Sequence, residues 1–429
     1  MQLAVYLFLL LFGILFLGVP IGIGMCTSVL LALQIWGEMP LNMIFRQYYQ
    51  GVDSYSLLAI PMFVLAGELM MQCGLIRDIM RLCKVFVGRL RGGLAHVNIL
   101  ASVLFAAMSG SAVADTASVG SMLIPAMEEE GYDAEFSVAV TASSSCLSPM
   151  IPPSIPMVVY SSTMSVSTAA MFMGGVIPGI LTAIALGTIV VYLSKKHNYP
   201  KDEEKIPVKE AVRTVIECIP AIVTPLIIMA GIFTGWFTAT ESAAIACVWV
   251  LLVGKFFYRT LTKEKVWKAL VTSMTTAGGI LLINAAAKPL SYLVAFSGVP
   301  TLCAQFISAH ISSKYVVLFL INIILLILGA MMECSANILI FAPILVPMAV
   351  SYGVDPLAIG VVFCINCAVG ICTPPFGPTL FIGSAIAKKP VTSCMKAILP
   401  FCMAEIAIVL LITYVPGLIT FLPKLFGLY

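Results

Sequence analysis

Two short polar segments, each inside a long apolar stretch, carry the residues of this sequence that could bind an ion. The first, residues 108–116, reads Met-Ser-Gly-Ser-Ala-Val-Ala-Asp-Thr and includes the carboxylate of Asp115. The second, residues 332–337, reads Met-Glu-Cys-Ser-Ala-Asn and includes Glu333. Carboxylate, hydroxyl and backbone carbonyl oxygens are the ligands that hard cations prefer. Ionisable residues inside a membrane are costly and mark sites or pathways, so we expect Asp115 and Glu333 to have functional roles.

A proline cluster follows each polar segment, at residues 146–156 and at residues 372–378. Proline removes a backbone donor and clashes with the preceding helical turn, so each cluster must interrupt a helix. Broken backbone at membrane depth is tolerated only where protein or water satisfies its polar groups. Carbonyls at such breaks suit a sodium ion, and half-helix N-termini present donors to an anion.

These features predict two sodium sites and a substrate site between them. Small hydroxylated residues also serve helix packing in lipid, which is the alternative role for each serine. The first predicted sodium site comprises Ser109, Gly110, Ser111, Asp115, Thr116, Ser144, Ser145 and Pro149. The second comprises Glu333, Ser335, Asn337, Asn366, Thr373, Pro374 and Gly377. The predicted substrate contacts are Ser111, Ala112, Ser154, Asn337, Pro375 and Thr379, with no obligatory lysine or arginine partner.

The chain contains an internal repeat with a constant offset. Six pairs of prolines, glycines and aspartates are each 222 positions apart: Pro125 and Pro347, Gly131 and Gly353, Asp133 and Asp355, Pro152 and Pro374, Pro153 and Pro375, and Pro156 and Pro378. At this offset Ser111 corresponds to Glu333 and Asp115 to Asn337. Interrupted hydrophobic segments at corresponding positions of two halves are a pointer to the binding site of a transporter.

The composition indicates a polytopic membrane protein. Hydrophobic residues make up 61% of the 429 residues and charged residues only 10%, whereas soluble domains carry about a quarter charged residues. The net charge of +3 and the placement of basic residues in loops do not indicate nucleic-acid binding. The N-terminal apolar run lacks a basic segment, so no cleaved signal peptide is predicted. The thirteen cysteines lie in apolar segments, where a buried small hydrophobe is favoured over a redox or metal role.

Apolar runs and their interruptions predict the elements that position the sites. Residues 2–35 are expected to form two short helices, residues 37–52 a polar loop, and residues 75–94 an amphipathic helix on the cytoplasmic surface. Residues 97–127 and 315–352 are expected to form re-entrant hairpins, and residues 134–161 and 358–387 broken helices. The other expected spans are 55–71, 169–193, 216–237, 239–257, 271–293 and 398–422, with a hydrophilic linker over 195–213.

The spans predict an inverted arrangement of the two halves. Five crossings separate the hairpins, and an odd number inverts the second copy. The two hairpins should therefore open from opposite sides, with their tips near the bilayer midplane. The basic loops then fall on one face, which we assign to the cytoplasm, and both termini lie outside. The predicted fold class is an all-α polytopic membrane protein with an inverted repeat, two opposed re-entrant hairpins and two broken transmembrane helices.

Other functions fit the sequence less well. An intramembrane serine protease needs a base, and neither polar segment contains histidine or lysine. A channel is possible, but an inverted repeat with opposed hairpins suits alternating access better than a continuous pore. The sequence has no P-loop, so ATP hydrolysis by this chain is not expected.

Several motifs resemble the large membrane subunit of tripartite ATP-independent periplasmic (TRAP) transporters. They are Gly-Ser-Ala-Val-Ala-Asp-Thr at 110–116, Ile-Pro-Pro-Ser-Ile-Pro at 151–156, Gly-Trp-Phe-Thr-Ala-Thr-Glu-Ser-Ala-Ala at 235–244, Thr-Pro-Pro at 373–375 and Leu-Ile-Thr-Tyr-Val-Pro at 411–416. The resemblance covers essentially the whole chain. One departure is that Cys334 follows Glu333 where the family pattern has a proline.

The resemblance implies a sodium-driven elevator in the bacterial inner membrane that imports an organic acid such as sialic acid or a dicarboxylate. It implies a small four-helix membrane subunit and a periplasmic substrate-binding protein as partners, membrane lipid around the chain, and no cofactor besides the coupling Na⁺. A related sodium-coupled carrier that works without a binding protein is the alternative. The implied division is scaffold and arm at 1–94, transport elements at 95–194, a cytoplasmic linker at 195–213, second scaffold and arm at 214–314, second transport elements at 315–390 and a C-terminal helix at 391–429.

Overall fold

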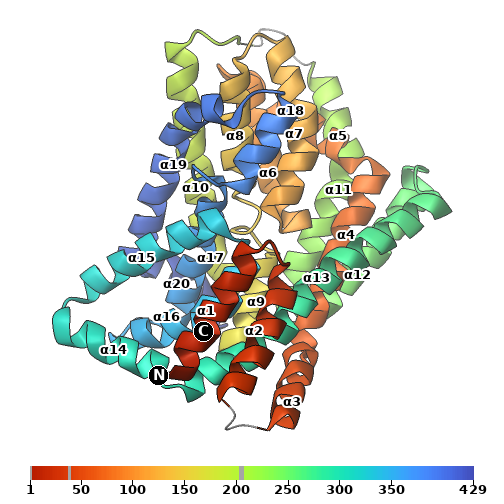
Figure 1. The fold of residues 1–429 in the computed structure, drawn as a ribbon. Helices are drawn as coiled ribbons and strands as arrows, with labels where there is room; N and C mark the ends of the chain where they lie inside the picture. Colours follow the sequence, from red (N-terminus) through yellow and green to blue (C-terminus); the bar gives the residue numbers. More distant parts are fainter. Residues whose placement is uncertain (1, 37–39, 202–206) are drawn as a thin grey trace.

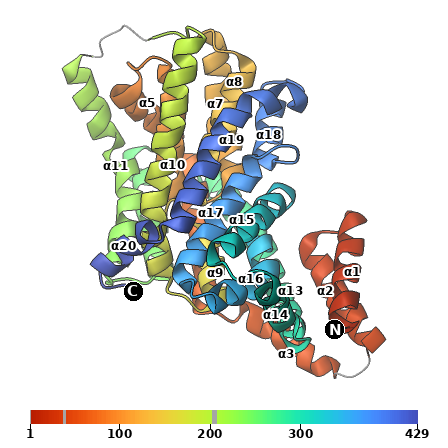
Figure 2. The ribbon, with the colours of Figure 1, turned by 90° about the vertical axis from the view of Figure 1, so that its left-hand side faces the viewer.

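The computed structural model describes residues 2–36, 40–201 and 207–429. Within these ranges the regular structure is helical, apart from a bridge between Arg91 and Lys201 (Figures 1 and 2). Both termini lie in the lower half of Figure 1, and helix α10 (Thr168–Lys196) ends and helix α11 (Val208–Phe233) begins at its top. The ends of the chain are therefore on the opposite side from the connection between its halves.

The first half of the chain runs from α1 to α10. Its first helices are α1 Gln2–Phe16, α2 Ile21–Trp36, α3 Leu41–Val52, the short helix Tyr55–Leu58, α4 Ala59–Cys73 and α5 Leu75–Val87. They are followed by α6 Gly93–Ser109, α7 Ala112–Glu129, α8 Ala134–Ser145, α9 Ile155–Met164 and α10 Thr168–Lys196.

The second half repeats this order. Its elements are α11 Val208–Phe233, α12 Ala239–Leu252 with a π turn Val253–Phe257, α13 Lys263–Phe296, α14 Val299–His310, α15 Lys314–Met331, α16 Cys334–Ser351, α17 Pro356–Cys372, α18 Pro378–Ile386, α19 Val391–Tyr414 and α20 Gly417–Leu425.

The offset of 222 found in the sequence carries over to the helices. Helix α16 begins and ends 222 positions after helix α7. Each helix contains a proline at the same place, Pro125 in α7 and Pro347 in α16. The peptide bonds Pro152-Pro153 and Pro374-Pro375, also exchanged by the offset, are both cis. The long helix α13 takes the place of α3 and α4 together. The structure therefore confirms the internal repeat.

The two predicted hairpins are present and enter the molecule from opposite ends. Helices α6 and α7 lie in the upper half of Figure 1, and α15 and α16 lie in the lower half. Each broken helix passes through the middle, with α8 and α18 above and α9 and α17 below. Helix α18 of the second half contacts α7 of the first, and α9 contacts α16. Each hairpin thus packs against a half-helix from the other repeat.

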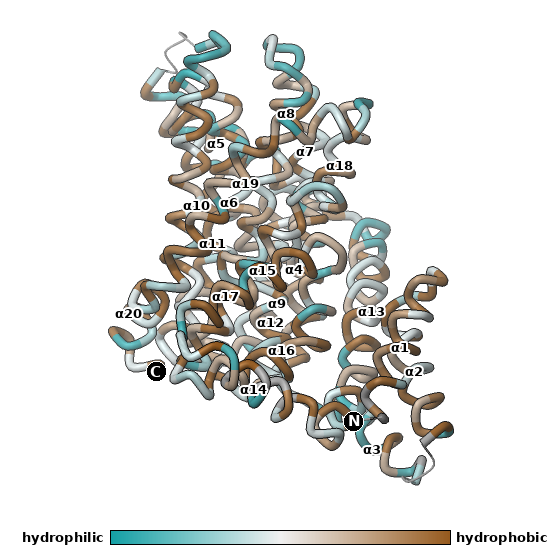
Figure 3. The backbone as a smooth tube through the Cα atoms, turned by 60° about the vertical axis from the view of Figure 1, so that its left-hand side comes forward, coloured by the Kyte–Doolittle hydropathy of each residue, from teal (hydrophilic) through white to brown (hydrophobic). Residues whose placement is uncertain are grey.

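Eight helices of the described ranges are long and apolar enough to cross a membrane. The tube coloured by hydropathy shows hydrophobic stretches along the helices and hydrophilic segments at both the upper and the lower end (Figure 3). Helices α15 and α16 are among the eight, yet they form a hairpin confined to the lower half in Figure 1. Length and hydropathy alone therefore do not distinguish a crossing helix from a hairpin arm.

Several predicted boundaries were wrong. The described part of the predicted loop 37–52 is mostly helix α3, whose Ile44 is buried while most of its other described side chains face outward; residues 37–39 lie outside the described ranges. The amphipathic helix ends at Val87 because Gly88 and the left-handed Gly92 separate it from α6. Helix α11 already begins at Val208, inside the predicted linker. The predicted span 398–422 is interrupted before Pro416, which leaves α19 and α20 as two helices.

Helix α14 is an element that was not predicted from the sequence. It lies between α13 and hairpin α15–α16, and it corresponds by the offset to the amphipathic helix α5. The left-handed glycine Gly298 separates it from α13. Each hairpin is therefore preceded by a short helix after a left-handed glycine, since Gly74 plays the same part before α5.

Candidate functional site

The first hairpin tip is a two-residue break between α6 and α7. Gly110 adopts a left-handed conformation with φ of 60° that ends α6. Ser111 then caps α7, and its hydroxyl accepts a hydrogen bond from the Ala114 backbone N–H at 3.5 Å. The Ser109 hydroxyl lies 3.5 Å from the Ser111 carbonyl oxygen. The tip therefore places hydroxyl and carbonyl oxygens together at the N-terminal end of a helix.

The first broken helix lies directly against this tip. A methyl group built on Gly110 would lie 2.9 Å from the Pro153 carbonyl oxygen and 3.2 Å from the Ile155 nitrogen, so only glycine allows this approach. One turn into α7, Asp115 is fully buried, and its Oδ2 accepts a hydrogen bond from the Ser148 hydroxyl at 3.3 Å. The structure thus joins the first polar segment to the break that follows it.

Hydroxyl groups at the end of α8 differ in whether they are already bonded. Ser144 receives a hydrogen bond from Ser102 at 3.1 Å and lies 3.2 Å from the Asn98 oxygen. Ser145 donates to the Thr141 carbonyl at 2.7 Å. The hydroxyl of Ser143 is buried and has no partner among the described residues. Of these three serines, Ser143 has the hydroxyl that is free to meet a ligand.

Thr116, a predicted ligand of the first sodium site, and Ser154, a predicted substrate contact, make local hydrogen bonds. The Thr116 hydroxyl donates to the Ala112 carbonyl at 2.9 Å, within its own helix. The Ser154 hydroxyl donates to the Pro149 carbonyl at 2.7 Å and caps α9. These contacts shape the helix ends, and the same oxygen atoms can still accept a bond from a ligand.

The second hairpin tip is capped by Glu333. Its carboxylate accepts hydrogen bonds from the backbone N–H groups of Ser335 at 2.8 Å and Ala336 at 3.3 Å, and from the Ser335 hydroxyl at 3.1 Å. An acidic N-cap is favourable because it meets unpaired donors and the positive end of the helix dipole. The Glu333 side chain is nevertheless exposed, so it lies at the surface of the tip.

Asn337 holds this tip together from inside. Its amide nitrogen donates to the carbonyls of Leu328 at 3.0 Å and Met332 at 3.2 Å, at the end of α15. Asn366 on α17 donates to the Asn322 side-chain oxygen at 2.6 Å, and Asn322 in turn donates to Thr413 at 3.1 Å. Hairpin, broken helix and α19 are thereby connected by buried amides.

The second helix break is a tight turn. The Gly377 nitrogen donates to the Thr373 carbonyl at 3.1 Å. The Thr373 hydroxyl donates to the Val369 carbonyl, one turn earlier in α17, at 2.7 Å. The buried Thr379 hydroxyl donates to the Ile371 carbonyl at 3.1 Å. Pro374 is partly buried, and Pro375 is exposed.

The structure does not connect Glu333 to this turn. All the hydrogen bonds of Glu333 within the described ranges stay inside its own tip. The sequence could not reveal this, because a carboxylate at a hairpin tip can either cap its own helix or reach across to another element. Asn366 connects the second broken helix to the hairpin through Asn322, whereas the hydrogen bonds of Asn337, like those of Glu333, stay within the hairpin.

Four buried side-chain atoms in these two regions have no hydrogen-bond partner among the described residues: Asp115 Oδ1, Ser143 Oγ, Asn337 Oδ1 and Asn366 Oδ1. Each region contributes one such atom from its hairpin and one from its broken helix. Buried polar atoms without a partner are costly, and an ion is one of the few explanations for them. All four are oxygen atoms, which suit a hard cation such as Na⁺.

A cluster of sulfur and carboxylate groups lies where the two broken helices meet α19, and the sequence did not indicate it. Ligand atoms of Cys146, Cys372 and Glu405 lie within 4.8 Å of one another, and all three residues are buried. The Cys372 thiol donates to Glu405 Oε2 at 3.1 Å and lies 3.8 Å from the Cys402 sulfur. Sequence spacing could not show the cluster because its members come from three separate helices.

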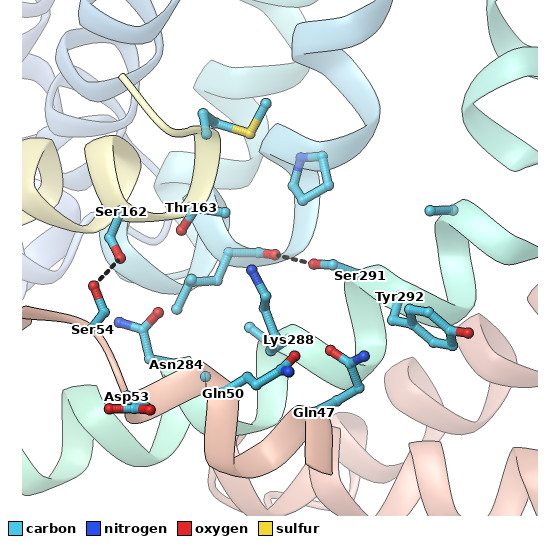
Figure 4. A pocket seen from close by; sticks show the side chains of 16 residues that line it. Gln47, Gln50, Asp53, Ser54, Ser162, Thr163, Asn284, Lys288, Ser291 and Tyr292 are labelled. Carbon is cyan, nitrogen blue, oxygen red and sulfur yellow. Dashed lines mark hydrogen bonds between the residues drawn. The ribbon is translucent and has the colours of Figure 1, made fainter. Parts of the chain in front are cut away.

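A cavity of about 490 Å³ lies apart from both predicted sites, between α3, α9, α13 and α16 (Figure 4). Lys288 of α13 projects into it. Sequence reasoning missed this residue, although a lysine within the apolar run 271–293 was the available signal.

Comparison with known proteins decides the family. The sequence matches the family described as "Tripartite ATP-independent periplasmic transporter, DctM component" over residues 8–418. The chain belongs to this family. It is 34% identical to the sialic acid TRAP transporter large permease protein SiaM of Vibrio cholerae, over 96% of this chain and 97% of SiaM. It is 32% identical to the C4-dicarboxylate TRAP transporter large permease protein DctM of Rhodobacter capsulatus, over 99% of this chain and all of DctM.

Other TRAP permeases extend the range of similar proteins. The isethionate TRAP transporter permease protein DctMQ of Oleidesulfovibrio alaskensis is 35% identical over 94% of this chain and 63% of its own length. A solved structure of the YdaH transporter of Alcanivorax borkumensis superposes with a TM-score of 0.63 at 15% identity, covering 88% of this chain and 89% of that one. This likeness concerns the fold. The chain is thus a multi-pass TRAP large permease, and the three TRAP relatives described above are named as transporter permeases and not as enzymes.

Proposed function

We propose that this chain is the sodium-coupled large permease subunit of a transporter that imports an organic acid anion across a bacterial inner membrane. Two Na⁺ ions bind at the sites built by the hairpin tips and the broken helices. The single observation that carries the proposal is the pair of buried, unpartnered oxygens at Asp115 and Asn337, which the internal repeat places at the same position of two opposed hairpins. A cation at each position would supply the missing partner.

The substrate in this proposal is an anion held between the two tips. Four helices begin in this region, and three of them have an uncharged residue at the N-terminal end: Ser111, Ser154 and Gly377. Unpaired backbone donors and the helix dipole make such ends suited to a carboxylate or sulfonate. The relatives named for sialic acid, C4-dicarboxylates and isethionate all handle organic anions. An anion of this class is therefore the proposed substrate.

The proposed mechanism is of the elevator type. Hairpins, broken helices, α10 and α19 would move as one body past a scaffold made of α1–α5 and α11–α14. The cross-contacts α7 with α18 and α9 with α16 support this division, because they tie the transport elements of the two repeats together. A small membrane subunit and a periplasmic binding protein complete the proposed assembly, in keeping with a family of tripartite transporters.

Reconstituted transport tests the proposal. Proteoliposomes would contain the chain with its small subunit, and would receive the binding protein with labelled sialic acid, succinate or isethionate. We expect accumulation of at least one acid under an inward Na⁺ gradient, and loss of accumulation when K⁺ replaces Na⁺ or the gradient is dissipated. Equal uptake with Na⁺ and K⁺ would overturn the coupling, and no uptake of any acid in this class would overturn the substrate assignment.

A further inference from the structure

The cavity between α3, α9, α13 and α16 contains a lysine that no other feature of the structure explains. Lys288 has an exposed side chain on α13, and Figure 4 shows its amino group near the centre of the cavity. Within the described part of the chain, Lys288 forms neither an ion pair nor a hydrogen bond. A charged residue in a membrane helix that lines a cavity is a mark of a substrate pathway.

The surroundings of Lys288 are polar and can bind an anion. Gln47, Gln50 and Asn284 present amide groups to the cavity, and Ser162 and Thr163 present hydroxyl groups from the end of α9 (Figure 4). The Ser162 hydroxyl lies 3.2 Å from that of Ser54. Asp53 is the acidic residue among those that line the cavity, and it lies at the edge in Figure 4. The volume of about 490 Å³ is within the range of small-molecule sites.

The position of Lys288 places the cavity on the side of the chain termini. Figure 1 shows α13 running obliquely from the right-hand middle of the molecule to its lower half, where both chain termini lie. Lys288 belongs to the C-terminal part of this helix, which spans Lys263–Phe296. In the topology predicted from the sequence both termini lie outside, on the side from which a binding protein would deliver substrate.

The cavity also lies between parts that the proposed mechanism moves relative to each other. Helices α3 and α13 belong to the scaffold, whereas α9 and α16 belong to the transport elements. The Ser291 hydroxyl of α13 donates to the Leu339 carbonyl of α16 at 3.5 Å, and Ser54 contacts Ser162 across the same boundary. A ligand in the cavity would therefore contact both parts at once.

We propose that this cavity is an anion-binding site, in which Lys288 pairs with the carboxylate or sulfonate of the incoming organic acid before it reaches the hairpin tips. The inference rests on the proposed function and adds a cationic partner to it. The substrate first meets Lys288 on the side of the termini, and the backbone donors at the tips bind it afterwards.

Uptake kinetics test the role of Lys288. Lys288→Met should raise the acid concentration for half-maximal uptake by about ten- to 150-fold, the range for losing a hydrogen bond to a charged group. Lys288→Arg should restore most of the affinity, and Lys424→Met, at an exposed lysine of α20, should have no effect. The Na⁺ concentration for half-maximal uptake should stay unchanged in Lys288→Met, because the sodium sites are elsewhere.

A labelling experiment tests binding without transport. Methyl acetimidate should modify both Lys288 and the exposed Lys424 in neutral-lipid nanodiscs. The transported acid should slow the modification of Lys288 and should not change the rate at which Lys424 is modified. Protection by phosphatidylglycerol but not by soluble acids would overturn the inference in favour of a lipid headgroup. If the wild type transports the acid and Lys288→Met has the same acid concentration for half-maximal uptake, this inference is wrong and the proposed function stands. If the wild type takes up no acid, the proposed function is wrong and this inference with it.

Discussion

Asp115 and Asn337 occupy the same position in the two hairpins, and each buries one side-chain oxygen that has no hydrogen-bond partner among the described residues. Each is the fourth residue of the helix that leaves its tip, in α7 and α16. The remaining polar atoms of the two side chains are bonded differently, since Asp115 accepts from Ser148 and Asn337 donates to two carbonyls. The local contacts of the two residues differ, but both tips keep an unpaired oxygen at the same position of the repeat. We infer that both tips need this oxygen.

The role of Ser111 can be separated into helix capping and ion binding. Glycine replaces a serine cap at a cost of only a few tenths of a kcal/mol, whereas alanine costs about 1 kcal/mol. If the hydroxyl is a sodium ligand, Ser111→Gly and Ser111→Ala should both raise the Na⁺ concentration for half-maximal uptake. The size expected is about five- to 150-fold, for loss of one oxygen ligand. A normal Na⁺ dependence in Ser111→Gly would assign the residue to capping alone.

Glu333→Gln distinguishes charge from shape at the second tip. Glutamine can still accept the hydrogen bonds that Ser335 and Ala336 donate, so the protein should fold in normal amounts. Loss of the negative charge should weaken Na⁺ binding, so we expect a lower Hill coefficient for sodium at matched protein levels. Uptake measured against Na⁺ concentration checks this. An unaltered sigmoidal curve would show that the Glu333 charge does not act on the ion.

Gly110→Ala should disrupt the contact between the first tip and the first helix break. The added methyl group would lie 2.9 Å from the Pro153 carbonyl oxygen, on a residue whose φ of +60° disfavours any side chain. We expect transport to fall strongly and the melting temperature to fall. Gly187→Ala on α10 is the matched control, since nothing lies within 4 Å of its added carbon. Equal behaviour of the two variants would contradict the close packing at the tip.

Tyr199 fixes the start of the first broken helix. Its hydroxyl donates to Asp133 at 2.5 Å, and its ring packs against Phe136 with centroids 4.7 Å apart. Burial, together with the hydrogen bond to Asp133, raises the pKa of Tyr199, so the hydroxyl keeps its proton at neutral pH. Tyr199→Phe should lower the melting temperature by a few degrees, for a loss of about 1 kcal/mol.

The pH dependence gives this prediction a second readout. Because the pKa is raised on folding, the stabilisation by Tyr199 should be complete below about pH 10 and be lost as the pH rises further. The exposed Tyr192→Phe serves as the control. A melting temperature that does not change in Tyr199→Phe would show that the hydrogen bond contributes nothing to stability.

The helix breaks and the internal repeat could be predicted from the sequence, because proline and glycine interrupt a helix at their own positions whatever the rest of the fold is. The breaks at 146–154 and 373–377 follow from their prolines, and the offset of 222 follows from the spacing of those residues in both halves. Boundaries set by tertiary contacts could not be predicted. The polar stretch of α3 forms a helix because its buried face packs on α13, which the sequence does not reveal.

The candidate site was predictable only in part. The sequence predicted that the polar residues of the first tip lie near the helix break, and the structure places the Ser148 hydroxyl within hydrogen-bond distance of Asp115. Which hydroxyls are free could not be predicted, because Ser143, Ser144 and Ser145 look alike in the sequence and differ only in their partners on α6 and within α8. Lys288 was missed because its importance depends on a cavity formed by four helices that are far apart in the chain.

The sodium dependence of uptake by Asp115→Ala and Asn337→Ala tests the central claim most directly. Wild-type uptake should depend on Na⁺ with a Hill coefficient above one. Each variant should raise the Na⁺ concentration for half-maximal uptake by about five- to 150-fold and bring the Hill coefficient closer to one. Ser121→Ala, at an exposed position of α7, should behave as the wild type. Variants that fold in normal amounts and keep the wild-type sodium curve would contradict the account.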